Sequence, residues 1–366
     1  MLKIKYKGPT LDPSGYGRAA RDYIGALNTT DAQIKVEPWG FEQKAPDFYG
    51  DAGRLVEELK HNDIDYDFVI HHYVPNRPAP EQGKINIGLV AWETTKLPDA
   101  WVDNMNSNYD MLIVPSEFNR RCFKASGINI PIEVVPHAIN VQELNDPEIS
   151  NLKLKGFENY HSFLSVFQWT ARKNPHGLLK SYFSAFEGHS DVVLILKTYR
   201  SSTSIKEQRA VQEEIREIKR NTKLKSGKYP PIYFIGELIN RETMISLYKN
   251  CDCFVLPTRG EAVGLPYIES AACGMDEIYT GFGGQTELFN STSGMIDYQL
   301  TPVSDMPWIP NYYADQFWAE PNLEHLIDLM RKSYESGIYT EPKLNEFSYQ
   351  NIGNQFTEAI KRNFSC

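Results

Sequence analysis

Residues 254–274 read F-V-L-P-T-R-G-E-A-V-G-L-P-Y-I-E-S-A-A-C-G, and this stretch decides how the rest of the chain is interpreted. Its apolar, β-branched start predicts a buried strand. Pro257 and Gly260 end that strand, and Pro266 then stands in the first turn of a short helix that Gly274 closes. The stretch therefore predicts a strand, a turn and a helix in immediate succession.

Two carboxylates with seven residues between them lie in this stretch. Glu261 falls in the turn and Glu269 in the helix, while Gly264 and Leu265 leave backbone N–H groups at the helix N-terminus. Such a helix end attracts phosphate. A diphosphate held there would have a carboxylate on either side for flanking hydroxyls, which suits a nucleotide sugar. The plain alternative is an ordinary strand-turn-helix with two solvated glutamates.

The stretch resembles a known motif. E-A-V-G-L-P followed by I-E-S is similar to the E-x7-E segment of retaining glycosyltransferases of the two-domain GT-B type, family 4 (glycosyl transferases group 1), whose usual form is E-G-F-G-L-P and then L-E-A. The resemblance implies an α/β protein with two doubly wound, Rossmann-like domains facing each other across a cleft. It also implies retaining, metal-independent and cofactor-free transfer from a nucleotide sugar, with UDP favoured, to an acceptor hydroxyl. Glu261 would hold the sugar and Glu269 the ribose.

The length of 366 residues predicts two domains. We expect an acceptor-binding domain at 1–150, a nucleotide-sugar domain at 151–345, and a helix at 346–366 that packs back toward the first domain. No apolar run is long enough to span a membrane, so the sequence predicts a cytoplasmic protein without stable membrane insertion. We expect a monomer or a homodimer. A net charge of −9 argues against coating nucleic acid or membranes by global attraction.

A glycine-bearing loop near the N-terminus supports a rival function. Gly15, Gly17 and Ala20 match the relaxed dinucleotide fingerprint G-x-G-x-x-A, and Glu37 follows about twenty residues later. This pattern keeps an NAD-dependent oxidoreductase in view. Against it, residues 9–15 intervene between the expected strand and the motif, where the fingerprint needs a tight turn.

A second rival is a metal-dependent transferase. Asp63, Asp65 and Asp67 form overlapping D-x-D patterns, the metal signature of the other glycosyltransferase architecture. They come before the expected strand, whereas ligand-facing loops follow the carboxyl ends of parallel strands.

Polar residues at such carboxyl ends are candidates for acceptor binding. His71 and His72 end one expected strand, and Glu93 and Thr94 follow another. Glu93 could orient or deprotonate an attacking hydroxyl, or simply line the site. The acceptor-side candidates, partly by resemblance, are Tyr16, Arg18, His71, Glu93, Thr94 and His137.

The second half of the chain supplies cations. After an expected strand at 161–169, Arg172 and Lys173 stand in a loop before a helix capped by Asn174. This loop resembles the G-R-…-K-G segment of the family, whose cations neutralise the departing diphosphate. The catalytic candidates are Glu261, Arg172, Lys173 and Glu93. The donor-binding candidates are Gly15, Gly17, Arg172, Lys173, Lys197, Gly236, Glu261, Gly264, Leu265 and Glu269.

The segment after Gly274 departs from the usual family form. The family continues P-V-I-A-T and then G-G-x-x-E, whereas this chain has Asp276 and Glu277 in place of the proline and valine. Gly283, Gly284 and Glu287 keep the ending. The sequence therefore leaves the local strand and the choice of donor open.

The acceptor is also open: a saccharide, a small hydroxylated compound, a protein, or a hydroxymethylated DNA base. The DNA hypothesis rests on residues 205–228, with eight Lys or Arg against four Glu, and on Arg120, Arg121 and Lys124. A solvated amphipathic helix explains the same charges. A non-catalytic nucleotide-sugar-binding module is a further alternative.

Overall fold

Two parallel six-stranded sheets form the framework of the protein, seen in a computed structural model of the 366-residue chain. The structure describes residues 1–40, 43–75, 79–149, 156–306 and 311–364. Internal contacts divide the chain into two units: residues 1–143, 262–265 and 343–366 form the first, and residues 144–261 and 266–342 the second. The domain boundary expected between residues 150 and 151 lies outside the described residues.

The first sheet has the strand order β2-β1-β3-β4-β5-β6, with every neighbouring pair parallel. Its order reverses between β1 and β3, because the chain passes from β1 to one side and later to the other. The strands are β1 (Lys3–Gly8), β2 (Gln33–Pro38), β3 (Phe68–His71), β4 (Ile85–Leu89), β5 (Met111–Val114) and β6 (Ile132–Val134). Strands β3 and β5 are buried at every position, as strands covered on both faces are.

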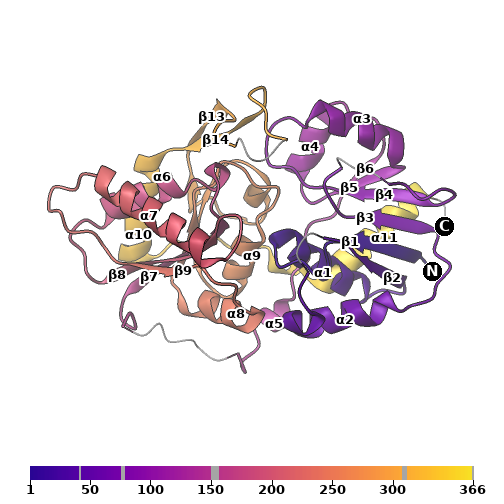
Figure 1. Cartoon of the computed structure of the whole chain (residues 1–366), viewed down its shortest axis with the longest axis horizontal. Helices are drawn as coiled ribbons and strands as arrows, with labels where there is room; N and C mark the ends of the chain where they lie inside the picture. Colours follow the sequence, from indigo (N-terminus) through magenta and orange to yellow (C-terminus); the bar gives the residue numbers. More distant parts are fainter. Residues whose placement is uncertain (41–42, 76–78, 150–155, 307–310, 365–366) are drawn as a thin grey trace. The chain divides into compact units, whose positions relative to one another are not determined.

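Helices cover the first sheet, and in Figure 1 α1 and α2 lie beside β1 and β2. The C-terminal helix packs on α1: Tyr349 donates a hydrogen bond to Asp22 at 2.6 Å, and Ile352 and Phe356 join the core around Ile24. The helices are α1 (Gly15–Leu27), η1 (Pro46–Tyr49), α2 (Gly50–Lys60), α3 (Asp99–Asn108), α4 (Glu117–Ala125), α5 (Val141–Leu144), η4 (Leu344–Phe347) and α11 (Tyr349–Asn363).

The second sheet has the order β12-β11-β10-β7-β8-β9 and is also parallel throughout. Its order reverses between β7 and β10. Its strands are β7 (His161–Gln168), β8 (Val192–Tyr199), β9 (Ile232–Ile235), β10 (Cys253–Leu256), β11 (Asp276–Thr280) and β12 (Met295–Ile296). The segment that departs from the family form therefore still forms a strand, β11.

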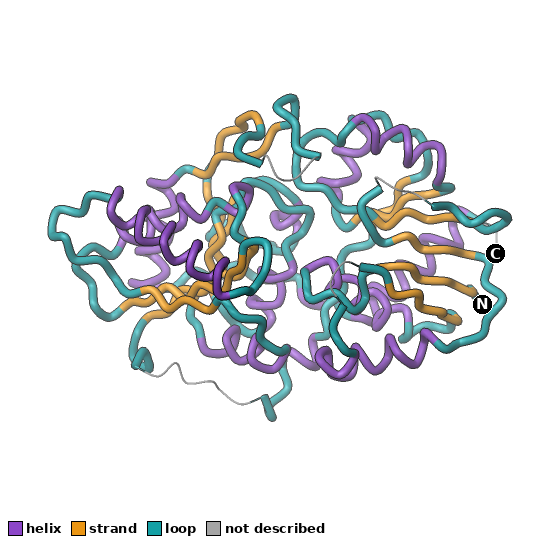
Figure 2. The backbone as a smooth tube through the Cα atoms, in the orientation of Figure 1, coloured by secondary structure: helices purple, strands orange, loops and turns teal. Residues whose placement is uncertain are grey.

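Helices flank this sheet too, as the purple and orange segments of Figure 2 show. Asn174 caps α6 as predicted, since its side chain accepts a hydrogen bond from Gly177 N at 3.0 Å. None of the helices that the structure describes is long and apolar enough to cross a membrane. The helices are η2 (Ala171–Lys173), α6 (Pro175–Ala185), α7 (Ile205–Asn221), α8 (Arg241–Asn250), α9 (Leu265–Ala272), η3 (Gly284–Glu287) and α10 (Leu323–Ser336).

A third sheet was not predicted. β13 (Tyr298–Pro302) and β14 (Phe317–Pro321) pair antiparallel as a two-stranded ribbon. The ribbon has a small hydrophobic core of its own, in which Trp318 packs against Val303 and Met306. The turn-rich aromatic sequence around it gave no alternating pattern from which two strands could be inferred.

Candidate functional site

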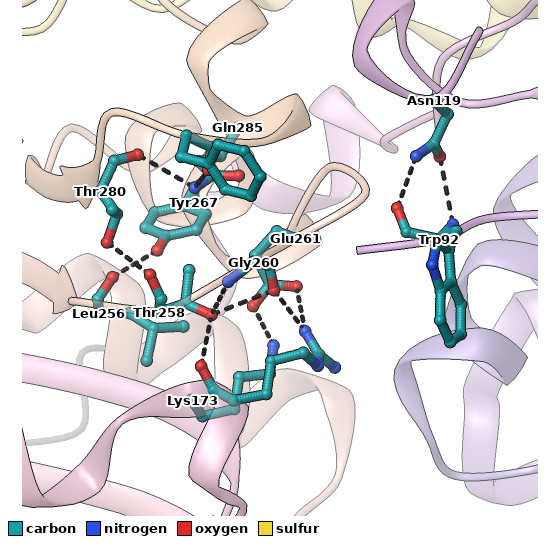
Figure 3. A network of polar contacts seen from close by, with 12 residues as sticks. Trp92, Asn119, Lys173, Leu256, Thr258, Gly260, Glu261, Tyr267, Thr280 and Gln285 are labelled. Atoms are coloured by element: carbon teal, nitrogen blue, oxygen red, sulfur yellow. Dashed lines mark hydrogen bonds and ion pairs between the residues drawn. The ribbon is translucent and has the colours of Figure 1, made fainter. Parts of the chain in front are cut away.

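The strand order of the second sheet brings the predicted catalytic residues together. At the reversal between β7 and β10, the loops that follow these neighbouring strands meet at the carboxyl edge, where doubly wound sheets bind ligands. Arg172 and Glu261 lie 89 residues apart in sequence, yet Arg172 Nη1 is 3.2 Å from Glu261 Oε2. Arg172 also donates to the Gly260 carbonyl at 2.6 Å. Lys173 Nζ pairs with Glu261 Oε1 (Figure 3).

Glu261 is ionised at the centre of this arrangement. Its exposed fraction is only 5%. Burial opposes ionisation, but the charges of Lys173 and Arg172 outweigh it, so the pKa of Glu261 lies below its ordinary value. We call Arg172, Lys173 and Glu261 the charged triad.

A hydrogen-bond network fixes the loop that carries Glu261 (Figure 3). Tyr267 donates to the Leu256 carbonyl and Thr280 to the Thr258 carbonyl, each at 2.6 Å. Gln285 Nε2 in turn donates to the Thr280 carbonyl at 3.0 Å. The network ties β10, α9 and β11 to one another, so the position of Glu261 is set by the whole sheet edge.

The G-G-x-x-E ending has a steric reason in this structure. Gly283 has φ +105°, and a Cβ atom there would lie 2.6 Å from the Glu261 carbonyl oxygen. Gly284 N donates to the same oxygen at 2.9 Å. The glycine is required so that the backbone can approach Glu261 closely.

The second carboxylate of the motif has partners that sequence reasoning missed. Glu269 lies on α9, which begins directly after Gly264 in the left-handed conformation, φ +82°. Arg241 Nη1 forms an ion pair with Glu269 Oε1 at 2.7 Å, and Tyr248 donates to Oε2 at 3.2 Å. Nothing in the spacing of Arg241 and Glu269 indicates this pair, because only the packing of α8 against α9 creates it.

Lys197 is a buried cation near the carboxyl end of β8. Its exposed fraction is 7%, and within the described residues it has no ion-pair partner. Burial lowers its pKa, against a weaker opposite effect of Glu237. The other donor candidate nearby, Gly236, is explained by packing, since a Cβ atom would lie 2.7 Å from the Phe234 ring.

The loop after β1 is not the tight turn of a dinucleotide fingerprint. Residues 9–14 separate β1 from α1. A Cβ atom at Gly17 would lie 2.0 Å from the Asp12 carbonyl oxygen, whereas a Cβ atom at Gly15 would meet no atom within 4 Å. The loop itself therefore requires glycine at position 17 and not at position 15.

An aromatic–histidine cluster, Tyr6, Tyr16, Tyr23, His72 and His137, lies at the order reversal of the first sheet. The Tyr6 hydroxyl is 2.6 Å from His72 Nδ1, and the Tyr16 ring centroid is 5.1 Å from that of His72. His137 Nδ1 is 3.2 Å from the Tyr23 hydroxyl. Burial lowers the pKa of His72 to about 3 and that of His137 to about 4, so both rings are neutral at pH 7.

Two other acceptor-side candidates are fully buried. His71 Nδ1 is 2.7 Å from the Tyr73 hydroxyl and its Nε2 is 2.8 Å from Asn86 Oδ1. The Thr94 hydroxyl accepts a hydrogen bond from Trp92 Nε1 at 2.7 Å. Both side chains have structural partners in their own unit, and their part in acceptor binding stays a prediction.

Glu93 and Arg18 are only partly buried. The charge of Glu93, after burial itself, raises the pKa of Tyr16. Arg18 pairs with Asp22 at 2.7 Å and with Glu143 at 3.1 Å. Glu93 thus lies close enough to Tyr16 to influence its hydroxyl.

The three aspartates behind the metal-dependent alternative lie before the amino end of β3. Asp63, Asp65 and Asp67 are exposed and precede β3, at the edge opposite to its carboxyl end. Asp65 contacts Lys84 at 3.4 Å. Across the part of the chain that the structure describes, no group of three or more His, Cys, Asp or Glu side chains is placed to hold a metal ion.

Several basic residues behind the DNA hypothesis form ion pairs. On α7, Arg216 and Arg220 both pair with Glu213, at 2.9 and 3.2 Å. On α4, Arg120 pairs with Glu117 at 2.7 Å. These carboxylates offset part of the positive charge.

Comparison with known proteins shows similarity to glycosyltransferases. Residues 151–296 match the family model of glycosyl transferases group 1. The chain is 23% identical over 256 residues to alpha-monoglucosyldiacylglycerol synthase of Streptococcus pneumoniae (strain ATCC BAA-255 / R6). That match covers 68% of this chain and 51% of the relative, so the chain spans about half the length of the curated relative it matches.

Solved structures share the fold over the whole chain. Anabaena HepE in complex with UDP and glucose is 14% identical with a TM-score of 0.61, covering 100% of this chain and 96% of that one. Sucrose-phosphate synthase of Thermosynechococcus elongatus is 13% identical with a TM-score of 0.66, covering 100% of both chains. The chain therefore has a GT-B-like fold with two parallel six-stranded sheets, and its residues 151–296 match the glycosyl transferases group 1.

Proposed function

We propose that the protein transfers glucose from UDP-glucose to a hydroxyl of a saccharide, with retention of configuration and without a metal ion. The observation that carries the proposal is the charged triad at the order reversal of the second sheet, with Lys197 as a further buried cation. HepE, which shares the fold, binds UDP and glucose, which supports this choice of donor. Retention follows from the family resemblance.

The charges of the site suit a departing diphosphate. Arg172, Lys173 and Lys197 carry three positive charges against the single negative charge of Glu261. Fixed cations stabilise the charge that develops on the leaving group without reorganising during the reaction. The N-terminus of α9 adds backbone N–H groups. In this proposal Glu261 holds the transferring sugar and Glu269 the ribose.

A saccharide acceptor is supported by an exposed tryptophan. Trp39 follows β2, at the carboxyl edge of the first sheet, and its side chain is 44% exposed. Its ring centroid lies 5.2 Å from that of Tyr73, and its backbone N–H donates to the Gly8 carbonyl at 2.7 Å. A large aromatic ring held in this way offers a flat apolar surface for the C–H face of a sugar ring.

The test is a nucleotide-sugar panel with EDTA present. UDP-, GDP-, ADP- and TDP-glucose are compared by thermal shift and by hydrolysis, on wild type, Lys197→Met and the exposed control Lys206→Met. We expect UDP-glucose to raise Tm and to be hydrolysed slowly. Lys197→Met should weaken UDP binding about tenfold, because it removes a cation without breaking an ion pair. Lys206→Met should bind like wild type.

Other outcomes identify the alternatives. Binding without hydrolysis or transfer would indicate a non-catalytic module, and a response to NAD alone would favour the oxidoreductase. Loss of all turnover with EDTA would contradict the metal-independent reaction. The acceptor screen then includes saccharides, diacylglycerol micelles and a duplex with hydroxymethylated cytosine, and transfer only to the lipid or the duplex would overturn the saccharide proposal.

A further inference from the structure

Ser270 has more short contacts than one hydroxyl group can satisfy as a donor. Its Oγ lies 2.6 Å from the Pro266 carbonyl oxygen, 3.1 Å from the Tyr267 carbonyl oxygen and 2.6 Å from Glu277 Oε1. A serine hydroxyl carries one hydrogen, and a carbonyl oxygen can only accept. If Ser270 donates to Pro266, the contact with Glu277 is a hydrogen bond only when the carboxyl group is the donor.

The surroundings of Glu277 also require a neutral side chain. Its exposed fraction is 0%, and Oε2 has no hydrogen-bond partner among the described residues. An ionised carboxylate there would be a buried charge without compensation, which is far more costly than a neutral acid.

The ionisable groups around Glu277 do not provide a counter-charge. The charge that acts on Glu277 is that of the adjacent Asp276 carboxyl on β11, which has the same sign. On α9, the carboxylate of Glu269 is already paired with Arg241. The other titratable neighbours are neutral at pH 7, because burial raises the pKa of Cys253 on β10, Tyr267 on α9, Cys273 after α9 and Tyr279 on β11. Burial raises the pKa of Glu277 and outweighs the opposite effect of the hydrogen bond with Ser270, and the charge of Asp276 raises it further.

Both partners are departures from the usual family sequence. Ser270 stands where the family has the alanine of L-E-A, and Glu277 stands where it has the valine of P-V-I. In the structure these two departures, seven residues apart, contact each other between α9 and β11. Alanine and valine could form no such bond, so the two residues act as a matched pair.

We propose that Glu277 is a positioning residue that keeps its proton at neutral pH and donates it in a hydrogen bond to Ser270, whose own hydroxyl donates to the Pro266 carbonyl. These two hydrogen bonds connect the first turn of α9 to β11. Glu269 is adjacent to Ser270, and the N-terminus of α9 is the end assigned above to the diphosphate. The effect on donor binding therefore rests on the proposed function, whereas the proton on Glu277 does not.

The proton is tested first, without any ligand. Wild type and Glu277→Gln are unfolded thermally from pH 5 to 9. Unfolded wild type releases the proton above the ordinary pKa of 4.5, whereas the folded protein retains it, so wild-type stability falls as pH rises. The Tm of Glu277→Gln minus that of wild type should therefore increase with pH. A protonated-acid C=O band, present in wild type at pH 7 and absent in Glu277→Gln, should appear in infrared difference spectra. A constant Tm difference and no such band would overturn the proposal.

The positioning role is tested by UDP affinity. Ser270→Ala and Glu277→Val should each weaken UDP binding about fivefold to tenfold, because the first leaves the Glu277 proton without an acceptor and the second removes the link between Ser270 and β11. Glu277→Gln and the family-like double variant Ser270→Ala/Glu277→Val should stay within about twofold of wild type. Wild-type affinity in both single variants would contradict the positioning role. If wild type does not bind UDP at all, the proposed function fails, while the pH series still decides the protonation of Glu277.

Discussion

The two sheets reverse their strand order in the same way but carry opposite chemistry at that place. In the first sheet the reversal between β1 and β3 holds the aromatic–histidine cluster, whose two histidines are uncharged because burial lowers their pKa. In the second sheet the reversal between β7 and β10 holds the charged triad. The same topology therefore places an uncharged cluster in one unit and a cluster with net positive charge in the other.

The two clusters differ in net charge, and this difference determines which ligands each can attract. The histidines of the first unit bond to tyrosines and stay uncharged, so they add little long-range field. The triad of the second unit keeps an excess of positive charge around one buried carboxylate. An anionic group such as a diphosphate is favoured by the second environment, and a neutral acceptor by the first.

The largest effect is expected when the charged triad loses its carboxylate. Glu261→Gln removes the carboxylate while nearly keeping its shape, and should lower kcat about 10² to 10³-fold. It should also destabilise the protein, because Arg172 and Lys173 lose their buried partner. Glu117→Gln, which breaks the exposed pair with Arg120, is the matched control and should change neither. Full activity in Glu261→Gln would remove this residue from the catalytic candidates.

A smaller effect is expected for the aromatic–histidine cluster, whose contribution to the free energy of unfolding should fall at acid pH. The folded pKa of His72 is about 3, below the ordinary 6.5, so the unfolded chain takes up protons that the folded chain does not. Stability present above pH 6.5 is then lost as pH falls, on the order of 3 kcal/mol by pH 4. Urea unfolding at pH 7 and pH 4 should show this loss, and His72→Gln should reduce it. The control His61→Gln, whose side chain is 70% exposed, should behave like wild type. Equal pH dependence in His72→Gln and wild type would contradict the neutral cluster.

The smallest change in stability is expected for Gly15→Ala, in contrast to the same substitution at Gly17. Gly17→Ala should cost more than about 2 kcal/mol of stability, because its Cβ would overlap the Asp12 carbonyl. Gly15→Ala should stay within about 0.5 kcal/mol of wild type, since no atom lies near its Cβ and alanine favours the start of α1. Chemical denaturation of the two variants measures both values. Similar losses in the two would mean that the loop constrains both positions.

Much of the charged site could be predicted from the sequence, because short patterns of neighbouring residues indicate the elements that carry its side chains. The strand-turn-helix around Glu261 and Glu269, and the capped helix after Arg172 and Lys173, follow from proline, glycine and apolar periodicity alone. Local patterns did not predict the β13–β14 ribbon or the partners of Glu269. Those features depend on contacts between residues distant in sequence.

The α/β class, the motif with Glu261 and Glu269, and the cationic loop with Arg172 and Lys173 could all be read from the order of the residues, because strand, helix and cap preferences act over a few neighbouring residues. Which of these groups come into contact depends on the folded arrangement of strands and helices. The strand order placed Arg172 and Lys173 against Glu261, and the packing of α9 on β11 joined Ser270 to Glu277. Burial then decided which groups are charged, since a side chain's pKa depends on the solvent and charges that the folded chain leaves around it.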